Sequence, residues 1–143
     1  MSDPFAGLSI PVDEAARLEL MNPKSNTVLR DLDGKACYVD LLSADSPVAK
    51  DHERRVSARL TSSRRSGRGY PPEEMEADGV ELLARLTTGW YLVNFDGLPL
   101  DIKFSLENAR LFYAQPGMQW ARRQVNSFVA DVANFVKASS TTS

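Results

Sequence analysis

Hydrophobic and polar positions alternate most regularly in two stretches of the N-terminal third, residues 16–21 (ARLELM) and 36–42 (ACYVDLL). A period of two is typical of strands with one buried face. Between them lie two turn signals, Asn-Pro at 22–23 and Asp-Gly at 33–34. The pattern therefore predicts a long antiparallel hairpin, with an additional strand-like piece at residues 27–29.

A helical period dominates residues 116–136 instead. Apolar side chains recur there at steps of three to five residues, which stacks them along one face of a helix. These side chains are Trp120, Val125, Phe128, Val132 and Phe135. Burying each aromatic ring contributes about 1.5 to 3 kcal/mol, so this helix is expected to be central to the fold.

Three further helices are expected between the hairpin and this last segment. One covers residues 47–61 after a start signal at Ser46-Pro47, and a leucine-rich one begins at residue 71 and continues to about Trp90. A short one follows Ser105 and ends near Ala114, after a loop around the Asp-Gly turn at 96–97. The predicted fold class is α+β, mainly α, with an N-terminal β-hairpin packed against about four helices and the C-terminal helix central.

The length of 143 residues and the 43% hydrophobic content fit one domain with a real core. We expect a flexible N-terminal arm at residues 1–13, a single globular domain at 14–137 and a disordered tail at 138–143. Inside the domain, residues 62–70 are rich in serine, glycine and arginine and are expected to form a flexible basic loop.

Charge and cysteine content exclude several classes of protein. A net charge of −2 argues against a surface built wholly for nucleic acid or anionic lipid. Cys37 is the only cysteine, so an internal disulfide and a cysteine-based zinc cluster are excluded. No apolar stretch reaches the 18 residues of a membrane span. We therefore expect a cytoplasmic protein that does not cross a membrane.

No residue pattern indicates an enzyme, a metal site or a cofactor. His52, the only histidine, lies between Asp51 and Glu53. Adjacent helical residues do not face one another, so an ordinary surface histidine is expected. Residues 31–34 (Asp-Leu-Asp-Gly) match part of a calcium loop, but the later bidentate glutamate is missing and a hairpin turn explains them.

Residues 50–68 contain seven basic and two acidic side chains. The candidate basic patch consists of Arg54, Arg55, Arg59, Arg64, Arg65 and Arg68. Phosphates are possible ligands, but no aromatic side chains are interleaved to stack bases, so nucleic acid is an unfavoured partner. We expect a solvated helix face whose arginines meet an acidic partner or the acidic segment 73–78.

The order of these segments resembles the tail assembly chaperones of long-tailed (siphovirus-type) phages and prophages, over residues 17–138. The similarity consists of the strand pair, an FS-x-EN-A helix start at 104–109, the tryptophan helix and an NF-x-K-x-S ending at 134–139. The resemblance implies a non-enzymatic protein that binds the tape measure protein and helps the major tail protein polymerise, in the host cytoplasm. It does not decide between a monomer and a homo-oligomer. The alternatives are a structural virion component, such as a tail-completion or head-tail connector protein, and a small nucleic-acid-binding regulator.

Such a chaperone needs an apolar groove for amphipathic helices. The candidate partner-binding residues are Trp90, Tyr91, Phe112, Tyr113 and Trp120. Two adjacent aromatics cannot both face the core, so we predict that Tyr91 and Tyr113 are more accessible than Trp90 and Phe112. Trp120 is expected in the core.

Overall fold

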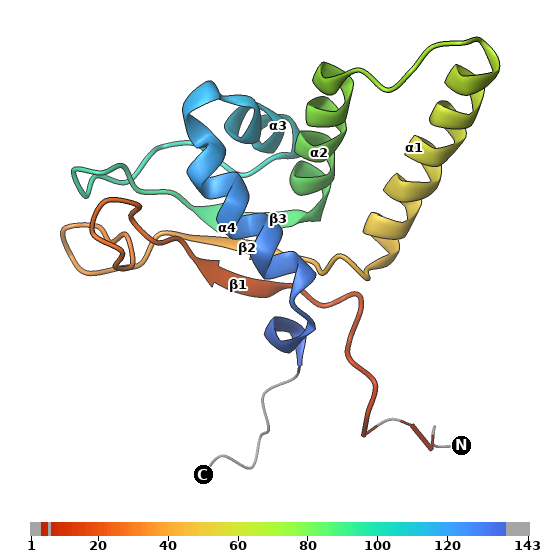
Figure 1. The fold of residues 1–143 in the computed structure, drawn as a ribbon. Helices are drawn as coiled ribbons and strands as arrows, with labels where there is room; N and C mark the ends of the chain where they lie inside the picture. Colours follow the sequence, from red (N-terminus) through yellow and green to blue (C-terminus); the bar gives the residue numbers. More distant parts are fainter. Residues whose placement is uncertain (1–3, 6, 137–143) are drawn as a thin grey trace.

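The computed structural model describes residues 4–5 and 7–136. A three-stranded antiparallel sheet is formed by β1 (Ala16–Glu19), β2 (Tyr38–Leu41) and β3 (Thr87–Tyr91), in the order β1-β2-β3. The helices are α1 (Pro47–Arg65), α2 (Pro72–Leu86), α3 (Leu106–Ala114) and α4 (Gln119–Ala130), with two short 3-10 helices, η1 (Pro116–Met118) and η2 (Val132–Phe135). Across residues 4–5 and 7–136 the fold is α+β and mainly helical, as predicted, with an N-terminal hairpin and four α-helices. Figure 1 shows how these elements are arranged.

The predicted hairpin is present, and its connection folds back on itself. β1 and β2 pair with Leu18 opposite Val39. The backbone N–H of Leu29 donates to the carbonyl of Leu20 at 2.9 Å, and the N–H of Cys37 donates to the carbonyl of Leu29 at 2.8 Å. The strand-like piece predicted at residues 27–29 is therefore confirmed.

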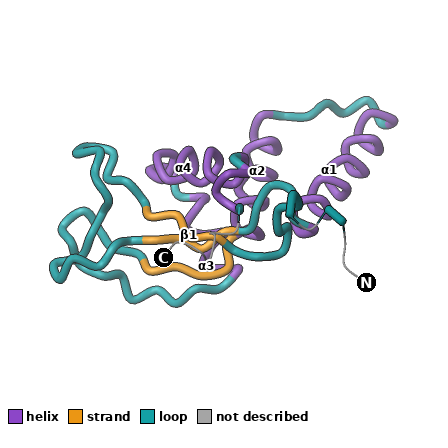
Figure 2. Tube along the Cα trace, turned by 90° about the horizontal axis from the view of Figure 1, so that it is seen from below, coloured by secondary structure: helices purple, strands orange, loops and turns teal. Residues whose placement is uncertain are grey.

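One face of the sheet carries the core. Val39 and Leu41 are completely buried, and the core also takes side chains from α2, α3 and α4. In α4 the buried positions Ala121, Val125 and Val129 recur every four residues, so one face of this helix packs on the core. Figure 1 shows α4 crossing the sheet, and Figures 1 and 2 together place α1 at one end of the molecule and the hairpin turns at the other.

The last helix is shorter than the sequence predicted. α4 ends at Ala130, and the side chain of Asp131 accepts a hydrogen bond from the N–H of Ala133, which starts η2. Because the chain changes direction there, Val132 leaves the apolar face and is 48% exposed, whereas Phe135 returns to the core.

The leucine-rich helix is also shorter than predicted. α2 ends at Leu86, and the next five residues form β3, in which Trp90 lies opposite Val39 and Tyr91 opposite Tyr38. The helical spacing of the leucines happens to continue to Trp90. Pairing with β2, some 50 residues earlier in the chain, decides the conformation instead.

α1 is longer than predicted, and its side chain His52 is more buried than predicted. The Ser46 hydroxyl accepts from the N–H of Ala49 and Pro47 follows as the first helical residue, as expected. The helix then continues to Arg65, so residues 62–65 are helical rather than part of a loop. His52 is only 8% exposed, so the expected surface position is wrong.

Residues 4–5 and 7–13 contain no helix or strand, and the predicted tail at 138–143 lies outside the described residues.

Candidate functional site

An apolar cleft of about 530 Å³ opens between β3, the segment that follows it, α3 and the start of α4. Its lining includes Trp90, Leu92, Phe95, Leu100, Ile102, Leu111, Phe112, Met118 and Trp120. These residues come from four different parts of the chain, so the cleft exists only in the assembled fold.

Aromatic contacts build the walls of this cleft. The ring of Trp90 meets Phe104 edge to face at 5.3 Å and lies 5.4 Å from Phe112. Its indole N–H donates to the carbonyl of Ile102 at 2.9 Å, which fixes the following segment against β3. Across the cleft, Phe95 and Trp120 lie 5.5 Å apart. Rings held by several neighbours keep an apolar surface in a defined shape.

Several apolar side chains of the lining remain open to solvent. Phe95 and Leu111 are 58% and 57% exposed, and Leu100 and Ile102 are 40% and 46% exposed. Single exposed apolar residues are common, but a continuous patch at a concave site indicates binding of another apolar surface. The cleft is therefore the strongest candidate binding site among the described residues.

Two polar side chains of the cleft lining, Asn94 and Asn108, form hydrogen bonds within the chain. Asn94 Oδ1 accepts from the N–H groups of Asp96 and Leu98, at 2.9 and 3.0 Å. Asn108 Nδ2 donates to the carbonyl of Lys103 at 2.9 Å. These bonds shape the wall, so recognition here rests mainly on apolar contact.

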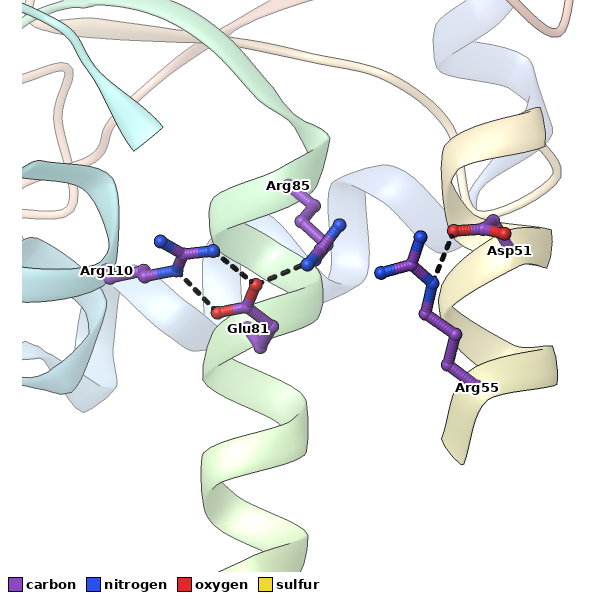
Figure 3. Close-up of polar contacts among 5 residues, drawn as sticks. All are labelled: Asp51, Arg55, Glu81, Arg85 and Arg110. Carbon is purple, nitrogen blue, oxygen red and sulfur yellow. Dashed lines mark hydrogen bonds and ion pairs between the residues drawn. The ribbon is translucent and has the colours of Figure 1, made fainter. Parts of the chain in front are cut away.

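An ion-pair cluster positions α3, which carries Leu111 and Phe112. The guanidinium of Arg110 donates two hydrogen bonds to Glu81 of α2, at 2.7 and 2.9 Å, and Arg85 donates a third at 2.7 Å (Figure 3). The hydrogen bond from Arg110 is the largest cause that lowers the pKa of Glu81, with Arg85 adding to it. These bonds attach α3 to α2.

Three of the five predicted partner-binding residues line the cleft, namely Trp90, Phe112 and Trp120. Trp120 is half-buried: it packs against the core, as predicted, and it also lines the cleft. Tyr113 is completely buried, and its hydroxyl is hydrogen-bonded to the Thr87 hydroxyl at 2.8 Å. Burial raises the pKa of Tyr113. The prediction that Tyr113 is accessible is wrong, because α3 turns this residue toward the core and Phe112 toward the cleft.

Tyr91 lies on the opposite face of the sheet from Trp90. Its ring is 6.1 Å from Tyr38, and Lys35 Nζ lies 4.1 Å from the ring centre. Its hydroxyl donates to the Asp31 carboxylate, and this hydrogen bond is the largest cause that raises the pKa of Tyr91 to about 12. Tyr91 is half-buried and outside the cleft, so it does not border the site as predicted.

Three arginines of the candidate basic patch form ion pairs with acidic side chains of the same chain. Asp51 pairs with Arg55 at 2.9 Å, as Figure 3 shows, and more distantly with Arg54. Arg59 pairs with Glu74 at 2.8 Å and also with Asp78, which confirms for this residue the predicted contact with segment 73–78. Within residues 4–5 and 7–136, no side chain pairs with the other three, Arg64, Arg65 and Arg68.

The Asp-Gly turn at 33–34 is explained by backbone hydrogen bonds. Asp31 Oδ1 accepts from the N–H groups of Asp33 and Lys35, both at 2.9 Å, and Gly34 has a φ of +87° that favours glycine. In the described part of the chain, no group of three or more histidine, cysteine, aspartate or glutamate side chains is arranged to hold a metal ion.

Leu100, Ile102 and Leu111 were not among the candidate residues from the sequence. A signal was present, because Leu98, Leu100 and Ile102 alternate in a loop where polar residues are usual. Apolar residues in a loop are typical of a contact surface.

Comparison with known proteins found no matching family, no similar curated protein and no matching solved structure. Across the described residues, no helix combines the length and the apolar character that crossing a membrane requires.

Proposed function

We propose that this chain is a tail assembly chaperone of a long-tailed phage or prophage, a non-enzymatic protein that acts in the host cytoplasm. Its cleft receives the apolar face of an amphipathic helix from the tape measure protein, and this keeps the tape soluble while the major tail protein polymerises around it. The observation that carries the proposal is the apolar cleft, with its ring walls and exposed Leu111 and Phe95.

A helix suits this cleft because of how apolar side chains are displayed on it. Residues at positions i, i+3, i+4 and i+7 form a narrow apolar stripe. The lining offers a matching strip, from Leu100 and Ile102 on one wall to Leu111 on α3 and Trp120 on α4. Asn94 Oδ1 and Asn108 Nδ2 are hydrogen-bonded within the chain, so a client is not required to satisfy these two atoms.

Co-expression with the tape measure protein tests the proposal. Leu111→Glu introduces a charge into the cleft at a position that is 57% exposed, so folding is expected to be retained. Met75→Glu is the matched control, because Met75 is 51% exposed on α2 and outside the lining. The wild type and Met75→Glu are expected to keep the tape protein soluble, and Leu111→Glu is expected to lose most of this effect.

Two results would contradict the proposal. The tape protein could be equally insoluble with and without the wild-type chain. Alternatively, mass spectrometry of purified virions could find the chain at stoichiometric copy number, which favours a structural virion component.

A further inference from the structure

β1 is an edge strand whose outer side has unused hydrogen-bonding groups. Leu18 pairs with Val39 of β2, and the N–H of Leu20 donates to Cys37, so the even-numbered residues face β2. The backbone groups of Arg17 and Glu19 therefore face away from the sheet. No other residue in the described ranges hydrogen-bonds to them.

The next outward position, Met21, shows what this edge can bind. Its N–H donates to Gln124 Oε1 at 2.8 Å, and its carbonyl accepts from Gln124 Nε2 at 2.9 Å. The side-chain amide of Gln124 thus makes the two bonds that a neighbouring strand would make. It closes the edge at Met21 and leaves two outward residues, Arg17 and Glu19, open.

The charges on the open edge are self-complementary. In an antiparallel pair of two β1 strands centred on Leu18, Arg17 of each copy lies opposite Glu19 of the other. Both residues point their backbone groups outward, so they form the hydrogen-bonded pairs that such a ladder requires. Registers centred on Arg17 or on Glu19 instead place like charges opposite each other, which is unfavourable.

A shallow groove of about 450 Å³ lies along the same edge, between β1, α4 and η2. Leu18, Met21 and Phe128 form its apolar part. In the register centred on Leu18, the second Leu18 lies on the same face as the first and enters this groove. The groove therefore offers room for the side chain that the pairing brings there.

We propose that two copies of this chain associate through their β1 edges, antiparallel across a two-fold axis at Leu18. The pairing joins two three-stranded sheets into one of six strands, and Gln124 limits the contact to the residues before Met21. Arg17 donates two hydrogen bonds to Asp40 of its own copy, through Nε at 2.8 Å and Nη2 at 3.2 Å, and its guanidinium lies 3.6 Å from the centre of the Tyr38 ring. A guanidinium has five N–H donors, so the other three are left for Glu19 of the second copy. This surface is separate from the apolar cleft, so the inference does not depend on the proposed function.

Disulfide formation tests the register. Residues at a non-hydrogen-bonded pair have Cα atoms about 4.5 Å apart, within reach of a disulfide, whereas diagonal neighbours lie too far apart. Under mild oxidation, Leu18→Cys is expected to form a covalent dimer on a non-reducing gel. Arg17→Cys and Glu19→Cys are the matched controls and are expected to stay mostly monomeric, as is the wild type, whose Cys37 is buried.

Charge variants test the association without new cysteines. Glu19→Arg puts two arginines at each contact and Arg17→Glu puts two glutamates there, so each variant alone is expected to be monomeric. Their equimolar mixture restores opposite charges at both contacts and is expected to give a heterodimer. Mass in solution would be measured by light scattering over a concentration series, after circular dichroism has shown that each variant is folded.

Three results would each contradict a different part of the proposal. A wild type that stays monomeric at all concentrations, together with no disulfide in Leu18→Cys, overturns the proposal. Efficient crosslinking of Glu19→Cys or Arg17→Cys overturns the register, and a mixture of the charge variants that stays monomeric overturns the charge pairing.

Discussion

At the scale of single residues, the contacts of the adjacent aromatic side chains Phe112 and Tyr113 determine which of them is buried in the core. Tyr113 is buried with its hydroxyl bonded to Thr87, whose own hydroxyl donates to the carbonyl of Leu83 at 2.8 Å. Its neighbour Phe112 packs edge to face against it at 4.9 Å and faces the cleft. Adjacency in sequence correctly indicated that the two rings diverge. It did not indicate which ring turns inward, because that depends on the position of α2.

Tyr113 variants test this arrangement. Tyr113→Phe removes one buried hydrogen bond and is expected to lower the free energy of unfolding by about 1 kcal/mol. Tyr113→Ala also leaves a cavity and is expected to cost about 3 to 5 kcal/mol. Urea unfolding followed by circular dichroism measures both. A Tyr113→Ala variant as stable as the wild type would contradict the buried position.

At the scale of elements, local signals in the sequence predicted most helix starts and fewer helix ends. Ser46 and Ser105 cap their helices through the expected N–H groups, since a cap depends only on nearby residues. The change from α2 to β3 at Thr87 depends on pairing with β2, which is far away in the sequence. The local spacing of apolar residues therefore does not indicate where the helix ends. For the same reason the sequence identified three rings of the cleft but not the loop side chains that complete its wall.

The α2–α3 ion-pair cluster gives a prediction about pH. Glu81 has a lowered pKa in the folded protein, so the unfolded chain takes up a proton more readily. Its stabilising contribution is therefore complete well above the ordinary value of 4.5 and is lost as the pH falls below it. Because Glu81 and its partners are partly exposed, we expect Glu81→Gln to cost no more than about 1 kcal/mol at pH 7 and much less at pH 3.

Urea unfolding at the two pH values measures this difference. Glu14→Gln is the control, because the Glu14 carboxylate makes no hydrogen bond or ion pair with any residue in the described ranges, and it should not show the same pH dependence. An equal cost for Glu81→Gln at both pH values would contradict an electrostatic role.

At the scale of the whole molecule, the loop between α1 and α2 divides the chain into two parts that build one core. β1, β2 and α1 precede it, and α2, β3, α3 and α4 follow it. The sheet joins the two parts, because β2 pairs with β3. Arg59 also links α1 to α2 through Glu74 and Asp78.

Trypsin tests this organisation. Arg65 ends α1 and Arg68 lies in the exposed loop, so both bonds are expected to be cut before those at buried or paired arginines. Since the β2–β3 pairing and the core are unaffected, the two fragments should elute together in gel filtration and separate only in denaturant. A variant with Arg64, Arg65 and Arg68 all changed to Gln is the control and should resist this first cut. Fragments that separate without denaturant would show that the sheet does not hold the two parts together.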